Sequence, residues 1–516
     1  MTTPTAPAPR RTLVDRFLDG VEKIGNKLPD PVMIFIAICA LVLIASWLAA
    51  AAGVSVTNPA TGKTVAAVNL LSADGLRRIL SEAVKNFGAF PALGLVLVVM
   101  LGIGVAEKTG YFEVAMRRVI ERAPQAMIIP VIIFTAVLGN VAGDAAPIVL
   151  PPLAAMVFLR LGLHPVAGVA MAYAAALGGF AANLILGMSD ALVLAFTAPA
   201  AALVDPTVET NTAMNYYFVA ASTFMLTAVV WVVATRVGIP RLGRYDNPEF
   251  VSQEQPALTP QEIKALRAAN WSLLAVVGVL LALSVPSNGL LRNATTGSLI
   301  QDSPLMNGIG LIITLFFFVP GLVYGLVAGK IRSGGDLAGM MTSSMASMGG
   351  FIVIVFFAAQ MLAFFNWSNL GTIIAVKGAE LLQNQHGMVL IVGVVILSSI
   401  VNIFIGSASA KWAILAPIFV PMMMLLGFHP AFTQMIYRVG DSITNPITPM
   451  LPYFPLVLGL AQKYDRKMGI GTLIAALLPY SIAIGVCWTI FLLVWFWLGW
   501  PVGPGGPIYL NTPVGG

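Results

Sequence analysis

The strongest constraint in this sequence is a series of long apolar runs that carry almost no charge. Clear examples are residues 31–52, 213–236 and 470–499. Each run supplies the about 20 residues that a helix needs to cross the hydrocarbon core of a bilayer. The runs are continuous in hydrophobicity, whereas a transmembrane β-barrel alternates apolar and polar residues. The sequence therefore predicts an all-α polytopic membrane protein, with the lipid bilayer as its surroundings.

Composition and motifs exclude several other classes of protein. Only 10% of the residues are charged, against about 25% in a typical soluble protein. The net charge of +6 comes largely from Lys and Arg in loops between apolar runs, so it predicts orientation and no nucleic-acid partner. The two cysteines, Cys39 and Cys487, exclude a disulfide framework. The sequence has no HExxH motif and no serine-hydrolase arrangement, so we expect no enzyme.

The basic residues also predict how the chain is laid out across the membrane. Lys and Arg favour the cytoplasmic side, which makes residues 1–30, with their five basic residues, a cytoplasmic N-terminal segment. Residues 31–500 form a single transmembrane domain, and residues 501–516 form an extracytoplasmic tail. About nine transmembrane helices and two re-entrant helical hairpins, near 127–160 and 389–427, account for the apolar runs.

Two halves of this domain resemble each other. The motif LGLHP at 161–165 recurs as LGFHP at 426–430, and in each half it follows a hairpin and precedes an interrupted apolar run. Charge bias places the two copies, roughly 89–236 and 338–499, in opposite orientations. An inverted repeat with hairpins and broken helices at the midplane is the plan of many secondary transporters. Chance similarity between apolar, Gly/Pro-rich segments is the alternative.

The second copy carries polar residues at membrane depth, where they are costly and commonly functional. Asp441 and Asn445 lie at a Pro-rich break, and Asn402 lies before the second hairpin tip. Carboxylate, amide and freed carbonyl oxygens at a helix break suit Na⁺ or a carried proton. Symmetry predicts a matching cation site in the first copy, built from Asn140, Asp144 and Asn183.

Four other residues suggest an organic substrate with an anionic group. Arg438 has the planar fork that binds a carboxylate or sulfonyl oxygen, and Lys411 could be a second anion ligand. Trp412 offers a flat wall for an aromatic ring. Asp190 could carry a proton or pair with a substrate amine. The structural alternatives are that Arg438 is paired permanently with Asp441 or Asp190, and that Trp412 only packs.

Four segments make the sequence similar to a known family. FLDGVEKIGNKLPDPVMIF, GNVAGDAAPIVLPPLAA, GSASAKWAILAPIFVPM and YRVGDSITNPITPMLPYFP, which begin at residues 17, 139, 406 and 437, resemble the AbgT family of aminobenzoyl-glutamate transporters. The resemblance covers nearly the whole chain. It implies a homodimer in the inner membrane of a bacterium, with nine spans and two hairpins in each protomer and no cofactor besides a coupling ion, Na⁺ or H⁺.

The same resemblance implies a site and a set of substrates. The family's substrate site matches Asp190, Ser409, Trp412, Pro430 and Arg438, and its sodium site matches Asn402, Asp441, Asn445 and Pro446. The implied substrates are p-aminobenzoyl-glutamate and, for some members, sulfonamide drugs that are exported at the expense of a proton gradient. A drug efflux pump without a folate-catabolite role is the closest alternative, and a passive channel is a more distant one.

Overall fold

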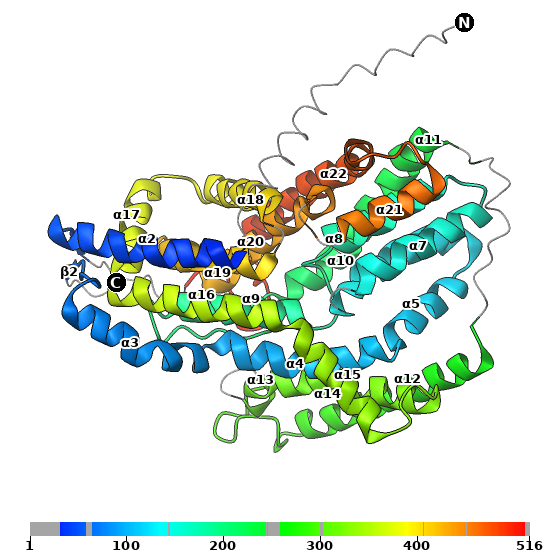
Figure 1. The fold of residues 1–516 in the computed structure, drawn as a ribbon, viewed down its shortest axis with the longest axis horizontal. Coiled ribbons are helices and arrows are strands. Elements are labelled where there is room, and N and C mark those ends of the chain that lie inside the picture. Colours follow the sequence, from blue (N-terminus) through cyan, green and yellow to red (C-terminus); the bar gives the residue numbers. More distant parts are fainter. Residues whose placement is uncertain are drawn as a thin grey trace, which may run out of the picture.

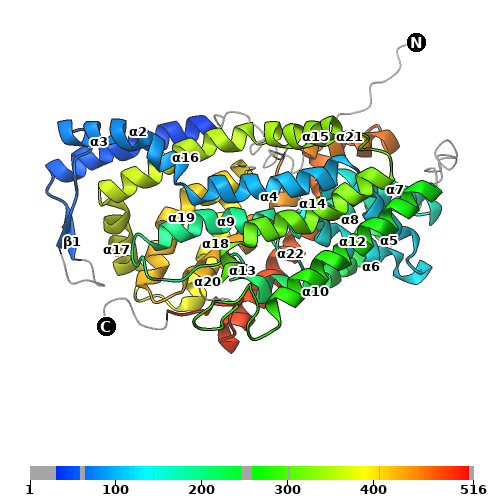
Figure 2. The ribbon, with the colours of Figure 1, turned by 90° about the horizontal axis from the view of Figure 1, so that it is seen from below.

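The computed structural model describes residues 31–57, 64–142, 145–243, 245, 258–299, 303–405, 407–449, 451 and 453–510. The predicted segment 1–30, the last residues of the predicted tail and Asp144 lie outside these ranges. The described part is a bundle of helices with one short pair of strands at an end of the molecule (Figures 1 and 2). The all-α prediction is confirmed.

Seven helices in the described part are long and apolar enough to cross a membrane. They are α2 (Pro31–Ala51), α10 (Tyr216–Val233) with its extension through the π-helix η3 (Ala234–Gly238) and α11 (Ile239–Leu242), α12 (Pro260–Ser284), α14 (Ile309–Val327), α16 (Gly349–Trp367), α19 (Ala408–Leu425) and α22 (Ile470–Leu498). The apolar helices expected of a multi-pass membrane protein are therefore present. The finer count of nine spans and two re-entrant hairpins stays a prediction.

Helices of 11–18 residues occupy the positions of the expected hairpins and interrupted spans. The first helix pair is α6 (Ile128–Leu138) and α7 (Ala145–Arg160), joined through the 3₁₀ turn η2 (Gly139–Ala142), and the second is α18 (Gly387–Phe404) and α19. The first interrupted run is α8 (Pro165–Gly178) and α9 (Met188–Ala201); the second is α20 (Pro430–Ile443), the 3₁₀ turn η5 (Asn445–Ile447) and α21 (Phe454–Tyr464). The two halves thus share the same order of elements.

The repeated LG-x-HP motif starts a helix in both halves. His164 and His429 are the N-caps of α8 and α20, and each imidazole Nδ1 accepts the backbone N–H two residues later at 3.2 Å. The following proline stands at the first helical position, where its missing N–H costs nothing. The preceding glycines have φ values of +68° and +90°, which L side chains rarely adopt. The histidines are therefore helix caps, as local chemistry requires.

Three helices on one side of the molecule pack closely together. The helix α4 (Pro91–Lys108) packs against α14, and α14 packs against α12 (Figure 1). A Cβ on Gly102 of α4 would lie 2.2 Å from the carbonyl oxygen of Thr314 on α14, so only glycine permits this approach. Small residues at helix crossings are typical of membrane bundles, where backbones pack directly.

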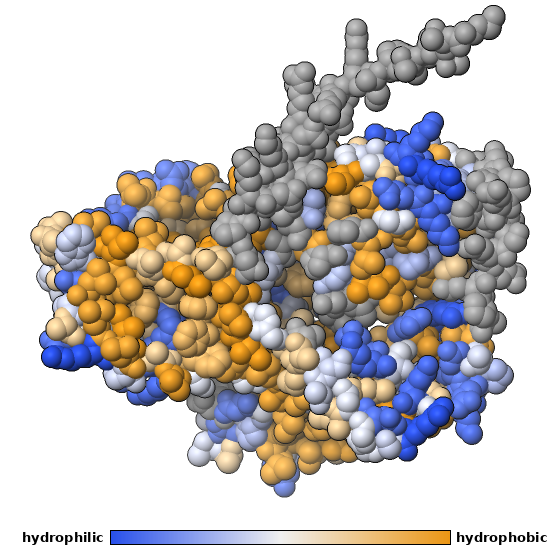
Figure 3. Space-filling model, in the orientation of Figure 1, coloured by the Kyte–Doolittle hydropathy of each residue, from blue (hydrophilic) through white to orange (hydrophobic). Residues whose placement is uncertain are grey.

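The remaining elements are shorter and complete the described part of the chain. They are the strands β1 (Ser55–Thr57) and β2 (Thr64–Ala66), which pair antiparallel, the helices α3 (Ala73–Gly88), α5 (Tyr111–Glu121), α13 (Pro304–Asn307), α15 (Gly334–Ser347) and α17 (Leu370–Leu382), and the 3₁₀ turn η1 (Gln125–Met127). The helix α3 carries an exposed apolar residue, Leu80, which is 83% exposed. In Figure 3 hydrophobic residues cover the face over α2 and α16, whereas hydrophilic residues gather where α5 and α12 lie.

Two helices have bounds that apolar composition alone does not indicate. The apolar run 338–366 is divided into two helices, α15 and α16, with Met348 between them. The helix α12 starts at Pro260, before its apolar part, because Thr259 and Glu262 form a capping box that begins the helix in charged sequence.

Candidate functional site

The polar residues singled out in the sequence meet where α9, α18, α19 and α20 pack together. The helix α19 packs against α9 and α20, and α20 packs against α18. Their charged side chains are almost completely buried, with exposed fractions of 1–3%: Asp190, Lys411, Arg438 and Asp441. Buried charges persist only when they are paired and hydrogen-bonded. The partners of these four residues therefore define the site.

The first ion pair joins the two halves of the chain. Arg438 Nη1 on α20 donates to Asp190 Oδ1 on α9 at 2.7 Å. The other carboxylate oxygen accepts the backbone N–H of Gly187 at 2.9 Å, at the N-terminus of α9. A carboxylate in the first turn of a helix is stabilised by the exposed amides there. Of the two acidic partners considered for Arg438, the structure selects Asp190.

The second ion pair lies one turn further along α20. Lys411 Nζ on α19 lies 2.5 Å from Asp441 Oδ1 and also donates to Asn402 Oδ1 on α18. The hydroxyl of Tyr437 lies 3.1 Å from the same Asp441 oxygen and 2.8 Å from the carbonyl oxygen of Ala408. Lys411 therefore faces the buried cluster, and its ammonium is satisfied by acceptors from two helices.

This second pair overlaps the candidate cation site of the second copy. Asn402 Nδ2 donates to Asn445 Oδ1 at 2.8 Å and to the backbone oxygen of Asp441 at 2.5 Å. The ammonium of Lys411 thus contacts two of the side-chain oxygens proposed for Na⁺, and the third already accepts a hydrogen bond. Pro446 is the second residue of the turn η5 and has no amide proton to donate. A sodium ion would share these oxygens with Lys411.

Trp412 directly follows Lys411 on α19. Two interactions hold it in place, a ring stack and a hydrogen bond from the indole nitrogen. Its ring stacks on Tyr437, with centroids 4.2 Å apart and an interplanar angle of 20°. Its Nε1 donates to Thr197 Oγ1 on α9 at 2.8 Å. The ring is fully buried, so an aromatic substrate would contact it only after a rearrangement that opens this packing.

Three residues of this network were missed from the sequence. Thr197 Oγ1 donates to Gln434 Oε1 at 2.6 Å, and Gln434 Nε2 donates to Asn215 Oδ1 at 2.5 Å. All three side chains are buried. The sequence does contain a signal for them, a glutamine and an asparagine inside apolar runs. Buried amides require hydrogen-bond partners, so these two residues indicate a buried polar network.

The remaining predicted residues lie around this cluster. Ser409 is half-buried near the start of α19, with its hydroxyl 3.1 Å from that of Ser407. Pro430 is buried at the first position of α20, eight residues before Arg438, which is about 12 Å along a helix. The structure therefore places it at the other end of α20 from the ion pairs.

In the first copy the two described polar residues contact backbone. Asn140 Nδ2 donates to the carbonyl oxygens of Val137 and Ala176 at 3.0 and 2.7 Å. Asn183 Oδ1 accepts the backbone N–H of Leu184 at 3.0 Å. In the described ranges no three His, Cys, Asp or Glu side chains gather as a metal site. The matching cation site stays a prediction.

Comparisons with known proteins agree with the fold and with the sequence motifs. The profile described as "AbgT putative transporter family" matches residues 16–510. The chain belongs to the AbgT family of transporters. It is therefore a multi-pass membrane transporter and not an enzyme.

Similar proteins are found at about 40% identity over nearly the whole chain. The p-aminobenzoyl-glutamate transport protein of Escherichia coli K12 is 39% identical over 487 residues, which cover 94% of this chain and 95% of that protein. The YdaH transporter of Alcanivorax borkumensis, whose crystal structure has an unusual topology, is 41% identical, with a TM-score of 0.88 over 92% of this chain and 100% of that one. MtrF of Neisseria gonorrhoeae, from a class of antimetabolite efflux pumps, is 42% identical, with a TM-score of 0.89 over 95% and 100% of the two chains.

Proposed function

We propose that this AbgT family member is a secondary active transporter of p-aminobenzoyl-glutamate-like folate catabolites, sulfonamide drugs or both, driven by a proton or sodium gradient. The observation that carries the proposal is the buried Arg438–Asp190 pair, which joins the broken runs of the two halves next to Trp412. The E. coli relative, named for p-aminobenzoyl-glutamate transport, supports the choice of substrate. The inverted repeat and the homodimer belong to the same proposal, as does a cytoplasmic N-terminus.

The chemistry of the pair suggests how transport would be coupled. A substrate carboxylate offers Arg438 the same kind of acceptor as Asp190, so substrate binding competes with the ion pair. Asp190, once released from Arg438, is left as a buried carboxylate without its partner, and we propose that it carries the coupling proton. Trp412 would hold the aromatic ring. Substrate and proton would thus exchange at one buried pair of side chains.

Efflux of antimetabolites is the second candidate function. The similarity to MtrF supports it, since MtrF is described as one of a class of antimetabolite efflux pumps. The same site would serve, because a sulfonamide also presents an aromatic ring and oxygen acceptors to Trp412 and Arg438. The two candidates differ only in the substrate that is bound most tightly.

The test is transport into proteoliposomes of purified protein. We expect saturable uptake of radiolabelled p-aminobenzoyl-glutamate under an imposed pH or Na⁺ gradient, and competition by sulfonamides if both are substrates. Arg438→Ala should abolish saturable uptake, and Arg438→Lys should restore little, because an ammonium lacks the planar fork. The matched control is Arg236→Ala, which removes an exposed arginine on η3.

Two outcomes would contradict the proposal, and a third would invalidate the assay. Equal flux without any gradient would indicate a passive channel. Normal saturable uptake by Arg438→Ala would remove Arg438 from the site. Loss of uptake in Arg236→Ala as well would mean that the assay reports general damage and not the loss of the site.

A further inference from the structure

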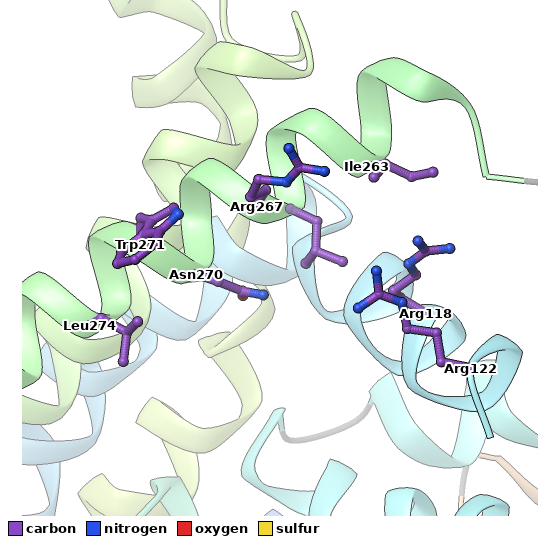
Figure 4. Close-up of a pocket in the computed structure, with 8 residues that line it drawn as sticks. Arg118, Arg122, Ile263, Arg267, Asn270, Trp271 and Leu274 are labelled. Carbon is purple, nitrogen blue, oxygen red and sulfur yellow. The ribbon is translucent and has the colours of Figure 1, made fainter. Parts of the chain in front are cut away.

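A second, chemically different pocket lies away from the buried ion pairs, between α5 and α12. Its volume is about 170 Å³. Its polar lining consists of Arg118 from α5, Arg122 directly after α5, and Arg267 and Asn270 from α12. Figure 4 shows the arginines of α5 and α12 on opposite sides of one hollow. Guanidinium groups from two helices therefore converge on one small volume.

The positive charge of this pocket is only partly balanced. Arg118 lies 3.6 Å from Glu121, and the same carboxylate is 3.4 Å from Arg117, so two arginines share one acid. Among the described residues, neither Arg122 nor Arg267 forms an ion pair. The hydroxyl of Tyr111 donates to Asn270 Oδ1 at 3.4 Å, which leaves the amide nitrogen of Asn270 as a further donor. The pocket offers donors and charge to an anion.

The pocket opens onto an apolar surface. Trp271 and Leu274 form part of its lining and are 68% and 58% exposed. They lie on α12, a candidate membrane span of which only 11% of the most apolar 18-residue stretch is buried. A tryptophan next to arginines at the end of a span is typical of the membrane interface. A soluble anion would use the arginines alone, whereas a phospholipid would use both surfaces.

We propose that this pocket binds the phosphate headgroup of an anionic phospholipid. The phosphate lies among Arg118, Arg122 and Arg267, and the acyl chains follow Trp271 and Leu274 along α12. Basic pockets between helices are a known way to hold anionic lipids, and each basic residue contributes about 1 kcal/mol near the surface. The lipid would hold α5 against α12. The proposal does not depend on what is transported.

The test is quenching of Trp271 fluorescence by brominated lipids in vesicles of phosphatidylcholine with phosphatidylglycerol. Each protein is measured with and without the additional substitution Trp271→Phe. The difference in fluorescence between the two is the signal of Trp271. We expect brominated phosphatidylglycerol to quench this signal more than brominated phosphatidylcholine. Arg122→Gln with Arg267→Gln should weaken the preference by about five-fold for each arginine. The matched control, Arg466→Gln with Lys467→Gln, removes the same charge from another exposed segment and should keep the preference.

Separate outcomes identify other occupants and would overturn the proposal. Equal quenching by both lipids, or a preference unchanged in the Arg122/Arg267 variant, would mean that the arginines hold no lipid. Displacement of the brominated phosphatidylglycerol by inorganic phosphate would indicate a site for a soluble anion. Absence of quenching by either lipid, together with a dimer that dissociates in Trp271→Phe, would show that a second copy of the chain covers this face.

Discussion

Replacing Lys411 by methionine should make the stability of the protein depend on sodium. Methionine keeps much of the length of the side chain but removes the ammonium that contacts Asp441 and Asn402. The Asp441 carboxylate, 2% exposed, would then keep only the hydroxyl of Tyr437 as a side-chain partner. Removing one member of a buried ion pair costs about 3–5 kcal/mol, because the other charge stays desolvated. We expect Lys411→Met to lose stability of that size in sodium-free buffer.

A sodium ion can relieve this penalty, because carboxylate and amide oxygens are its preferred ligands. At a concentration one hundred times its dissociation constant, bound Na⁺ would return about 2.7 kcal/mol of stability. In the wild type the ammonium already contacts these oxygens. Two unit positive charges about 4 Å apart repel each other by about 4 kcal/mol at an effective dielectric constant of 20. We therefore expect little response of the wild type to Na⁺.

The assay is the thermal unfolding midpoint in NaCl and in choline chloride at equal ionic strength. The midpoint of Lys411→Met should rise in NaCl, and that of the wild type should be unchanged. The control variant, Lys411→Met with Asp441→Asn, removes both charges, so it should recover most of the stability and lose the sodium response. An equal sodium response in the wild type and in Lys411→Met would refute the reasoning, since it would mean that the ammonium and Na⁺ do not compete.

Other substitutions test the packing around the site and the helix starts. Trp412→Phe keeps the stack on Tyr437 but loses the hydrogen bond from Nε1, which is worth about 1 kcal/mol. The apparent affinity for p-aminobenzoyl-glutamate in the uptake assay should therefore weaken by up to about tenfold. Gly102→Ala places a Cβ against the backbone of α14 and should cost about 1–3 kcal/mol in thermal unfolding, whereas Gly94→Ala, with no atom within 4 Å, should be neutral. Thr259→Ala removes the capping box of α12 and should cost about 1 kcal/mol, seen as faster amide hydrogen exchange in its first turn.

Local chemistry explains which parts of the fold could be predicted from the sequence. Proline fixes φ and lacks an amide proton, so LGLHP and LGFHP each predict the end of one helix and the start of another. The structure begins α8 and α20 at the prolines of these motifs. The break at Met348, by contrast, has no proline. It divides an apolar run into α15 and α16 beside two glycines, Gly349 and Gly350, which weaken a helix but do not fix where it breaks.

The pairing of the buried charges could not be predicted in the same way. Asp190 and Arg438 are separated by 248 residues in the chain, and the hydrogen bond from Trp412 to Thr197 spans 215 residues. Sequence patterns identified the charged residues as costly at membrane depth but gave Arg438 two possible acidic partners. The packing of α20 against α9 decides between these two partners. It brings Asp190 to Arg438, and Asp441 pairs with Lys411 instead.

The arrangement of the two pairs has a mechanical consequence. The Lys411–Asp441 pair joins α19 to α20, both in the second half of the chain, so it can move as a unit. The Arg438–Asp190 pair joins α20 to α9 of the first half. A relative movement of the two halves must therefore break or stretch the Arg438–Asp190 pair, and it can leave the Lys411–Asp441 pair intact. Breaking a buried pair is costly unless each charge finds a new partner. A substrate anion for Arg438 and a proton for Asp190 supply both partners, which is why coupling of substrate to ion is expected at this contact.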